Sequence, residues 1–178
     1  MYTELLIAGY GGQGSLMMGE ILAMAHTKNG GNATWQPTYT TAKRGGEANC
    51  SVILADEEIL CPEIDNPEIL VCFNQASYDK YAPTAVKGGI VLVNSDEAPE
   101  CKIPDGVHVY QIPATQLANE AGTDKAINIV MMGALLKLRP MITMDEVAAT
   151  LTEIWGEKRA EKLLPVNLKA LELGQKAI

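Results

Sequence analysis

The stretch IAGYGGQGS, residues 7–15, decides the fold class of this chain. It follows an apolar run, and its glycines match the spacing Gly-x-Gly-x-x-Gly. Glycines at these places permit a tight turn from a strand into a helix, whose first backbone N–H groups then face an anion. The stretch predicts a β-turn-α unit whose turn can hold a phosphate. The candidate contacts are Gly9, Gly11, Gly12, Gln13 and Gly14.

The sequence does not show which ligand, if any, this turn binds. The alternative is that the glycines serve only a tight turn and close helix packing. A nicotinamide site needs an Asp or Glu near the end of the second strand, about 20 residues beyond the glycines, to hold the ribose hydroxyls. The corresponding segment, residues 34–37, reads TWQP and contains no acid. An ordinary NAD site is therefore disfavoured.

Strand and helix patterns alternate outward from this unit. Residues 15–28 predict a helix with Met17, Ile21 and Met24 on one face, and residues 74–87 predict a helix broken near Pro83. Extended segments are predicted at 32–40, 48–56, 68–73, 88–95 and 107–113. This order indicates a Rossmann-like α/β fold: a doubly wound, mostly parallel sheet with helices on both faces and a helical C-terminal segment, in a single domain spanning 1–178.

Pro37 places the second extended segment at an edge or a strand end. In the C-terminal third, Thr143 and Glu146 have the spacing of a capping box before a helix that ends near Gly156. Pro165 is predicted to open the last helix, with Leu164, Leu168 and Leu171 at packing spacing. The last two helices can pack on the sheet or on a partner.

Charge and cysteine spacing disfavour several functional classes. Lys and Arg number 14 against 22 Asp and Glu, a net charge of −8, which argues against general binding to nucleic acid or anionic lipid. The longest apolar stretch, residues 127–136, is far shorter than the roughly 20 residues that a bilayer requires, and no export signal is visible, so we expect a cytoplasmic protein without a membrane partner. The cysteines lack metal-ligand spacing, so we expect buried thiols and no metal site: Cys50, Cys61, Cys72 and Cys101.

A basic loop follows the second extended segment. Lys43 and Arg44 stand beside Gly45 and Gly46, a few residues after Tyr39. The planar donors of arginine suit phosphate or carboxylate, and adjacent glycines let the backbone close on a ligand. The loop is a candidate anion site, and a solvated basic turn is the equal alternative.

Amide side chains mark the ends of two strands. Asn74, Gln75 and Asn94 follow apolar runs, and in an open parallel sheet ligands bind at that edge. The alternative is that they cap the next helix or turn, which we favour for Asn94. His26 and His108 are isolated, and no nucleophile motif or P-loop lysine is present, so we assign no catalytic residue.

Several of these segments together carry a family resemblance. They are AGYGGQG, TWQPTY, KRGGEANCSV, CPEIDNPEILVCFNQASYDKY, GGIVLVNS and NIVMMGAL, spread over roughly residues 3–138. Their order closely resembles the gamma subunit of 2-oxoacid:ferredoxin oxidoreductases. The resemblance implies a complex that decarboxylates a 2-oxoacid on thiamine diphosphate and Mg²⁺, passes electrons through iron–sulfur clusters to ferredoxin, and transfers the acyl group to coenzyme A.

In such a complex this chain would bind no cofactor alone. It would be a scaffold that completes the assembly with thiamine-diphosphate-binding and ferredoxin-like subunits and helps to enclose substrate or coenzyme A. With Tyr10 between its glycines, the first glycine motif is most similar to that of the 2-oxoglutarate branch. The family's loop commonly has a glycine and a glutamate where this chain has Thr40 and Ala42. A stand-alone nucleotide-binding or sensing module and a purely structural subunit are the alternatives.

Overall fold

A six-stranded sheet with the order β2-β3-β1-β4-β5-β6 forms the centre of the molecule. The computed structural model describes residues 1–40 and 46–178. The strands are β1 (Tyr2–Tyr10), β2 (Asn32–Tyr39), β3 (Glu47–Ala55), β4 (Ile69–Cys72), β5 (Ile90–Asn94) and β6 (His108–Ile112). The helices are α1 (Ser15–Lys28), α2 (Gln75–Tyr81), η1 (Ala82–Thr84), α3 (Ala114–Ala121), η2 (Asp124–Ala126), α4 (Ile127–Leu138), α5 (Met144–Trp155) and α6 (Glu157–Lys176).

Most of the sheet is parallel, as predicted. β1, β4, β5 and β6 run parallel to one another, whereas β3 lies antiparallel between β1 and β2. β2 and β3 are consecutive in the chain and pair antiparallel, so these two strands form a hairpin that extends the sheet on one side. Pro37 lies in the outermost strand β2, which confirms its predicted edge position.

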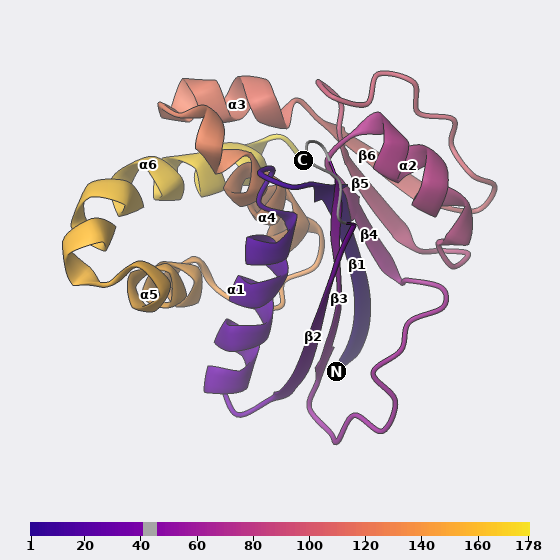
Figure 1. Ribbon diagram of the computed structural model, residues 1–178, viewed down its shortest axis with the longest axis horizontal. Helices are drawn as coiled ribbons and strands as arrows, with labels where there is room; N and C mark the ends of the chain where they lie inside the picture. Colours follow the sequence, from indigo (N-terminus) through magenta and orange to yellow (C-terminus); the bar gives the residue numbers. More distant parts are fainter. Residues whose placement is uncertain (41–45) are drawn as a thin grey trace.

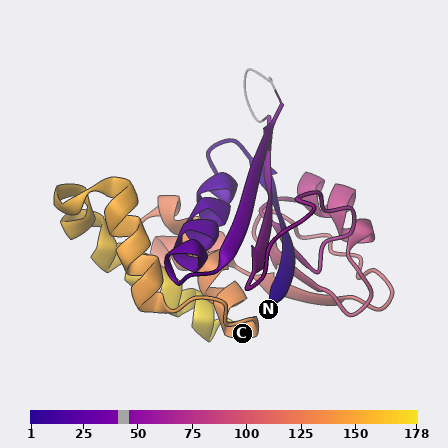
Figure 2. The same ribbon diagram turned by 90° about the horizontal axis from the view of Figure 1, so that it is seen from below.

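Helices cover both faces of the sheet unequally. Figure 1 shows α1 and α3 to α6 on one side and α2 on the other, and Figure 2 shows the same division from below. Alternate residues of β4 supply the two cores: Ile69 and Val71 join the large core with α1 and α4, and Leu70 and Cys72 join the smaller core with α2. The period of two in a strand therefore divides an entirely apolar segment between two layers.

The buried face of α1 differs from the predicted one. Ile21 is buried, but Met17 and Met24 are only partly buried, and the inward line runs through Met18 and Leu22. The reason is Gly19, which lies so close to Cys50 and Val52 of β3 that an added Cβ would collide with them. This approach turns the face beside Gly19 toward the sheet.

The C-terminal helices confirm one prediction and correct another. Thr143 and Glu146 form the capping box of α5: the Thr143 N–H donates to Glu146 Oε2 at 2.6 Å, and Thr143 Oγ1 accepts from the Glu146 N–H at 3.3 Å. The prediction that Pro165 opens the last helix is wrong, because α6 begins directly after Gly156 and contains Pro165. Pro165 and Glu161 are exposed, so water can bond the Glu161 carbonyl that loses its donor.

The last two helices are integrated into the helical layer. α6 packs on α3, α4 and α5, and α5 also packs on α1. Among the described residues, no helix is both long and apolar enough to cross a membrane.

Candidate functional site

The glycine turn joins β1 to α1 at the carboxyl end of the parallel strands. Gly12 and Gly14 have φ values of 97° and 83°, a region that favours glycine. The Gln13 N–H donates to the Tyr10 carbonyl at 3.1 Å, which closes the turn. The Gly11 N–H donates to the Gly46 carbonyl at 3.0 Å, so the predicted turn touches the end of the β2–β3 hairpin.

Gln13 and Asn74 meet beneath this turn. Gln13 Oε1 accepts from the Tyr10 N–H at 2.8 Å and from Asn74 Nδ2 at 2.9 Å. Asn74 Oδ1 accepts from the Ser77 N–H at 2.9 Å, so Asn74 also caps α2. Both predicted site residues therefore hold the turn against the next strand end with their amides engaged in protein contacts.

Asn49 supports the same turn from the other side and was not among the predicted residues. Asn49 Oδ1 accepts from the Gly9 N–H at 3.2 Å, and Asn49 Nδ2 donates to the Tyr81 hydroxyl at 2.8 Å. Gly9 is needed here because an added Cβ would lie 2.9 Å from Gln13 Oε1 and 3.1 Å from Phe73 Cβ. The only sequence signal for Asn49 is that it is a polar residue within a mainly apolar strand segment after the basic loop.

A hollow of about 330 Å³ opens over the first turn of α1. Tyr10, Gly11, Gly12 and Gly14 line it together with Tyr39 of β2 and the first residues of α1. No side chain caps α1, and the backbone N–H groups of residues 15–17 donate to no described residue. Free N–H groups at the positive end of a helix dipole attract an anion. An added Cβ on Gly12 would meet nothing within 4 Å, so the backbone here is open to a ligand.

Asn128 of α4 borders this helix start and was also missed. An added Cβ on Gly14 would lie 2.7 Å from Asn128 Cγ and 2.8 Å from its Nδ2. Asn128 is 3 % exposed, and its side chain packs directly against the Gly14 backbone at the start of α1. An amide in contact with the open start of a helix is a candidate ligand contact. The lone polar residue inside the apolar stretch 127–136 was the available signal.

The basic loop lies only partly within the described residues. Lys43, Arg44 and Gly45 lie outside the described residues, whereas Tyr39 and Gly46 lie at the two described ends of the hairpin. Tyr39 is 65 % exposed and lines the hollow.

The remaining two candidates lie in other networks. Gln75 Oε1 accepts from the Glu100 N–H at 3.0 Å, and its Nε2 donates to Asp79 and to the Glu100 carbonyl. Asn94 Oδ1 accepts from the Asp96 N–H at 3.4 Å, within the turn that directly follows β5, and from the Ala114 N–H at 3.1 Å at the start of α3. Neither residue lines the hollow over α1.

Two of the cysteines and one of the histidines occupy buried structural positions. Cys50 and Cys72 are buried, and burial raises the pKa of the Cys50 thiol to about 12. Cys61 is exposed, which corrects the expectation of buried thiols, because its loop leaves the sheet between β3 and β4. His26 is buried with Nε2 3.0 Å from the Ala55 carbonyl. No group of three or more potential metal ligands occurs in residues 1–40 and 46–178.

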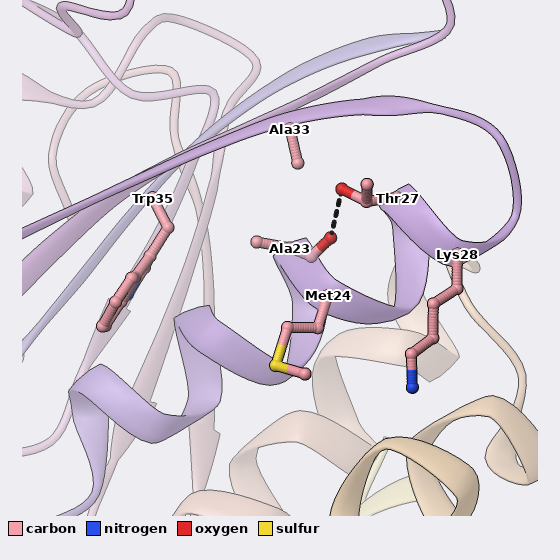
Figure 3. A pocket seen from close by; sticks show the side chains of 6 residues that line it. All are labelled: Ala23, Met24, Thr27, Lys28, Ala33 and Trp35. Carbon is pink, nitrogen blue, oxygen red and sulfur yellow. Dashed lines mark hydrogen bonds between the residues drawn. The ribbon is translucent and has the colours of Figure 1, made fainter. Parts of the chain in front are cut away.

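A second hollow, of about 370 Å³, lies between α1 and β2 (Figure 3). Trp35, Ala33, Ala23 and Met24 give it a mainly apolar lining. Figure 3 shows the Thr27 hydroxyl bonded to the Ala23 carbonyl, at 2.9 Å, within the helix. Lys28 is the one charged residue among those that line this hollow. It forms an ion pair with Glu153, so the described lining offers no free charge.

Comparison with known protein families places the chain. Residues 4–177 match the model of the family described as pyruvate ferredoxin/flavodoxin oxidoreductase. The chain belongs to this family. The resemblance of the glycine turn and the strand motifs to 2-oxoacid:ferredoxin oxidoreductases is thereby confirmed.

Members of the family differ in length around the shared segment. The ketoisovalerate oxidoreductase subunit VorA of Methanothermobacter marburgensis is 36 % identical over 97 % of this chain, and the chain spans 36 % of that relative's length. The 2-oxoglutarate synthase subunit KorC of Methanocaldococcus jannaschii is 33 % identical over 98 % of this chain and 95 % of its own.

A solved structure of the family gives the same fold. It is the 2-oxoglutarate:ferredoxin oxidoreductase of Magnetococcus marinus with 2-oxoglutarate, coenzyme A and succinyl-CoA bound. The two structures agree with a TM-score of 0.89 at 26 % identity, over 99 % of this chain and 31 % of that chain. The family segment thus occurs both as a separate subunit and as part of a longer chain.

Proposed function

We propose that the chain is the gamma subunit of a 2-oxoacid:ferredoxin oxidoreductase and that its glycine turn binds an anionic part of coenzyme A. The observation that carries this proposal is the open start of α1 in a chain whose whole length corresponds to a family segment. The match to KorC over nearly its full length supports a separate subunit. We also propose that residues 1–178 form a single domain, as the sequence predicts.

The turn fits a phosphate group. The free N–H groups of residues 15–17 and the exposed backbone at Gly12 would hold phosphate oxygens. Tyr39 and Asn128 would flank the bound group. Coenzyme A, when bound, supplies the thiol that accepts the acyl group, and this chain's contribution is to bind and orient it.

The other cofactors of the complex would reside elsewhere. The described residues bring together no ligand set that fits Mg²⁺ or an iron–sulfur cluster. We assign thiamine diphosphate, Mg²⁺ and the clusters to partner subunits, with ferredoxin as the electron acceptor. For the 2-oxoacid we propose 2-oxoglutarate, supported by Tyr10 and the KorC relative, and ketoisovalerate is the competing substrate because of VorA.

Purification of the native protein with its companions tests the assignment. We expect thiamine-diphosphate-binding and ferredoxin-like subunits to copurify and the assembly to oxidise 2-oxoglutarate in a coenzyme A-dependent reaction. Copurification of neither subunit would refute the subunit assignment, and micromolar NAD or ATP binding by the turn would favour a nucleotide-binding module. If the assembly oxidises ketoisovalerate faster than 2-oxoglutarate, ketoisovalerate replaces 2-oxoglutarate as the proposed substrate.

A matched pair of glycine variants tests the turn. Gly12 and Gly30 both have positive φ values, 97° and 87°, and open space around an added Cβ, but only Gly12 lines the hollow. In the assembled complex, Gly12→Ala is expected to raise the KM for coenzyme A about tenfold with kcat unchanged, because it removes uniform binding. Gly30→Ala should leave KM unchanged. An unchanged KM in Gly12→Ala would exclude the turn from coenzyme A binding.

A further inference from the structure

A groove of about 580 Å³ lies on the helical side of the molecule. Its walls come from the first turn of α1, the segment between α3 and α4, and the junction of α5 with α6. Met17 borders both this groove and the hollow at the glycine turn, so the two sites are neighbours.

Three cations line the groove: Lys125, Arg159 and Lys162. None of them forms an ion pair with a described residue, and the described lining contains no acid. Other cations of the chain do form such pairs, namely Lys28, Lys80, Arg139 and Lys176. In a protein of net charge −8, this is a concentration of unneutralised positive charge around a concave site.

The start of α6 contributes to the positive potential of the groove. Arg159 lies in the first turn of α6, near the positive end of the helix dipole, and Lys162 lies in the second turn. A cation in the first turn is unfavourable, whereas an anion bound beside Arg159 gains from both the side chain and the dipole.

The rest of the lining suits a planar organic group. Trp155, the last residue of α5, is partly buried and lines the groove together with the three cations. Asn167 is 7 % exposed, and its Nδ2 donates to the Leu163 carbonyl at 2.8 Å. Its Oδ1 accepts from no described residue and so remains available to an N–H donor.

We propose that this groove binds an organic phosphate of the nucleotide class. Lys125, Arg159 and Lys162 hold the phosphates, and Trp155 stacks on the base. Asn167 Oδ1 accepts from an N–H group of the base. The volume lies within the ordinary range for small-molecule sites, whereas inorganic phosphate would fill little of it. The inference uses only this chain's residues and does not depend on the oxidoreductase assignment.

Fluorescence of Trp155 tests the site in the full chain. Trp35→Phe leaves Trp155 as the sole tryptophan, and calorimetry on the unsubstituted chain gives a parallel measurement. ATP is expected to change Trp155 fluorescence with saturation, and Arg159→Gln or Lys162→Gln is expected to weaken ATP binding at least about tenfold. Lys158→Gln is the matched control, because Lys158 is exposed and adjacent in α6 but does not line the groove.

Four results would overturn the proposal. Absence of ATP binding at millimolar concentration removes the site, and equal weakening in Lys158→Gln shows a diffuse charge effect. Binding without a Trp155 response places the nucleotide elsewhere. Tripolyphosphate binding as tight as that of ATP shows an anion site without base recognition. Gly12→Ala should leave ATP binding intact, so the glycine turn and the groove are tested separately.

Discussion

Gly133 of α4 lies against the carbonyl of Leu171 in α6 so closely that no Cβ could stand between the two helices. The reciprocal contact joins Gly174 of α6 to the carbonyl of Val130 in α4. These two glycines bring the helix backbones together and fix α6 to the helical layer. The C-terminal helices thus belong to the core of this chain, although their sequence alone also allowed them to pack on a partner protein.

The first prediction follows from this crossing. Gly133→Ala forces the helices apart and is expected to lower the free energy of unfolding by about 2 kcal/mol, within the usual cost of overpacking. Urea denaturation followed by circular dichroism measures the change. Gly11→Ala is the control, because the nearest atom to its added Cβ is the Gly46 carbonyl oxygen at 4.0 Å. A stability equal to that of the unsubstituted chain would refute the close crossing.

The second prediction concerns the capping box of α5. Thr143→Ala removes one of its two hydrogen bonds and is expected to cost about 1 kcal/mol at neutral pH. Thr152→Ala in the same helix is the control, because the Thr152 hydroxyl bonds only to the Ala148 carbonyl within the helix. An equal loss of unfolding free energy in the two variants would show that the cap does not stabilise the fold.

The same box predicts a dependence on pH. Hydrogen bonding from the Thr143 backbone N–H lowers the pKa of the Glu146 carboxyl from its ordinary value. A depressed pKa in the folded state stabilises the fold above the ordinary value, and this stability is lost as the pH falls below it. Urea titrations at neutral pH and below about pH 4 should show a smaller acid loss in Glu146→Gln than in the unsubstituted chain. An equal loss would contradict the box's contribution.

Much of the fold could be predicted from local pattern. Extended segments bounded by glycines or polar residues predicted all six strands, and the capping box predicted the start of α5. The antiparallel place of β3 between β1 and β2 could not be predicted, since strand periodicity carries no information about neighbours. The prediction that Pro165 opens the last helix failed because the preference of proline for helix starts is only statistical. In the structure α6 starts directly after Gly156.

The site was predictable in its parts but not in its contacts. The glycine pattern located the turn, yet the bond between Gln13 and Asn74 joins residues 61 positions apart. Asn49 and Asn128 meet the turn only through the pairing of β3 with β1 and the packing of α4 on α1. Such long-range partners follow from the tertiary structure and have no local signature.

The third prediction separates the four thiols. Cys61 is exposed, whereas burial raises the pKa values of Cys50 and Cys72 and keeps both thiols protonated. Because the thiolate is the reactive form, iodoacetamide near pH 8 should alkylate Cys61 first and Cys50 and Cys72 only after unfolding. Cys101 is partly buried with a raised pKa, so it should react at an intermediate rate. Peptide mass spectrometry over time measures the order, and early labelling of Cys72 would contradict the packing of α2 on β4.

The fourth prediction addresses Asn128 at the start of α1. Asn128→Asp would place a carboxylate beside Gly14, where it competes for the free N–H groups and repels an anion. Pyrophosphate or coenzyme A binding at the turn, measured by calorimetry, should weaken at least about tenfold. Asn32→Asp is the matched control: it adds the same charge at the exposed start of β2, outside the hollow. Because the two variants share one net charge, weakening in both would mean that overall repulsion acts, and weakening in Asn128→Asp alone would assign the effect to the first turn of α1.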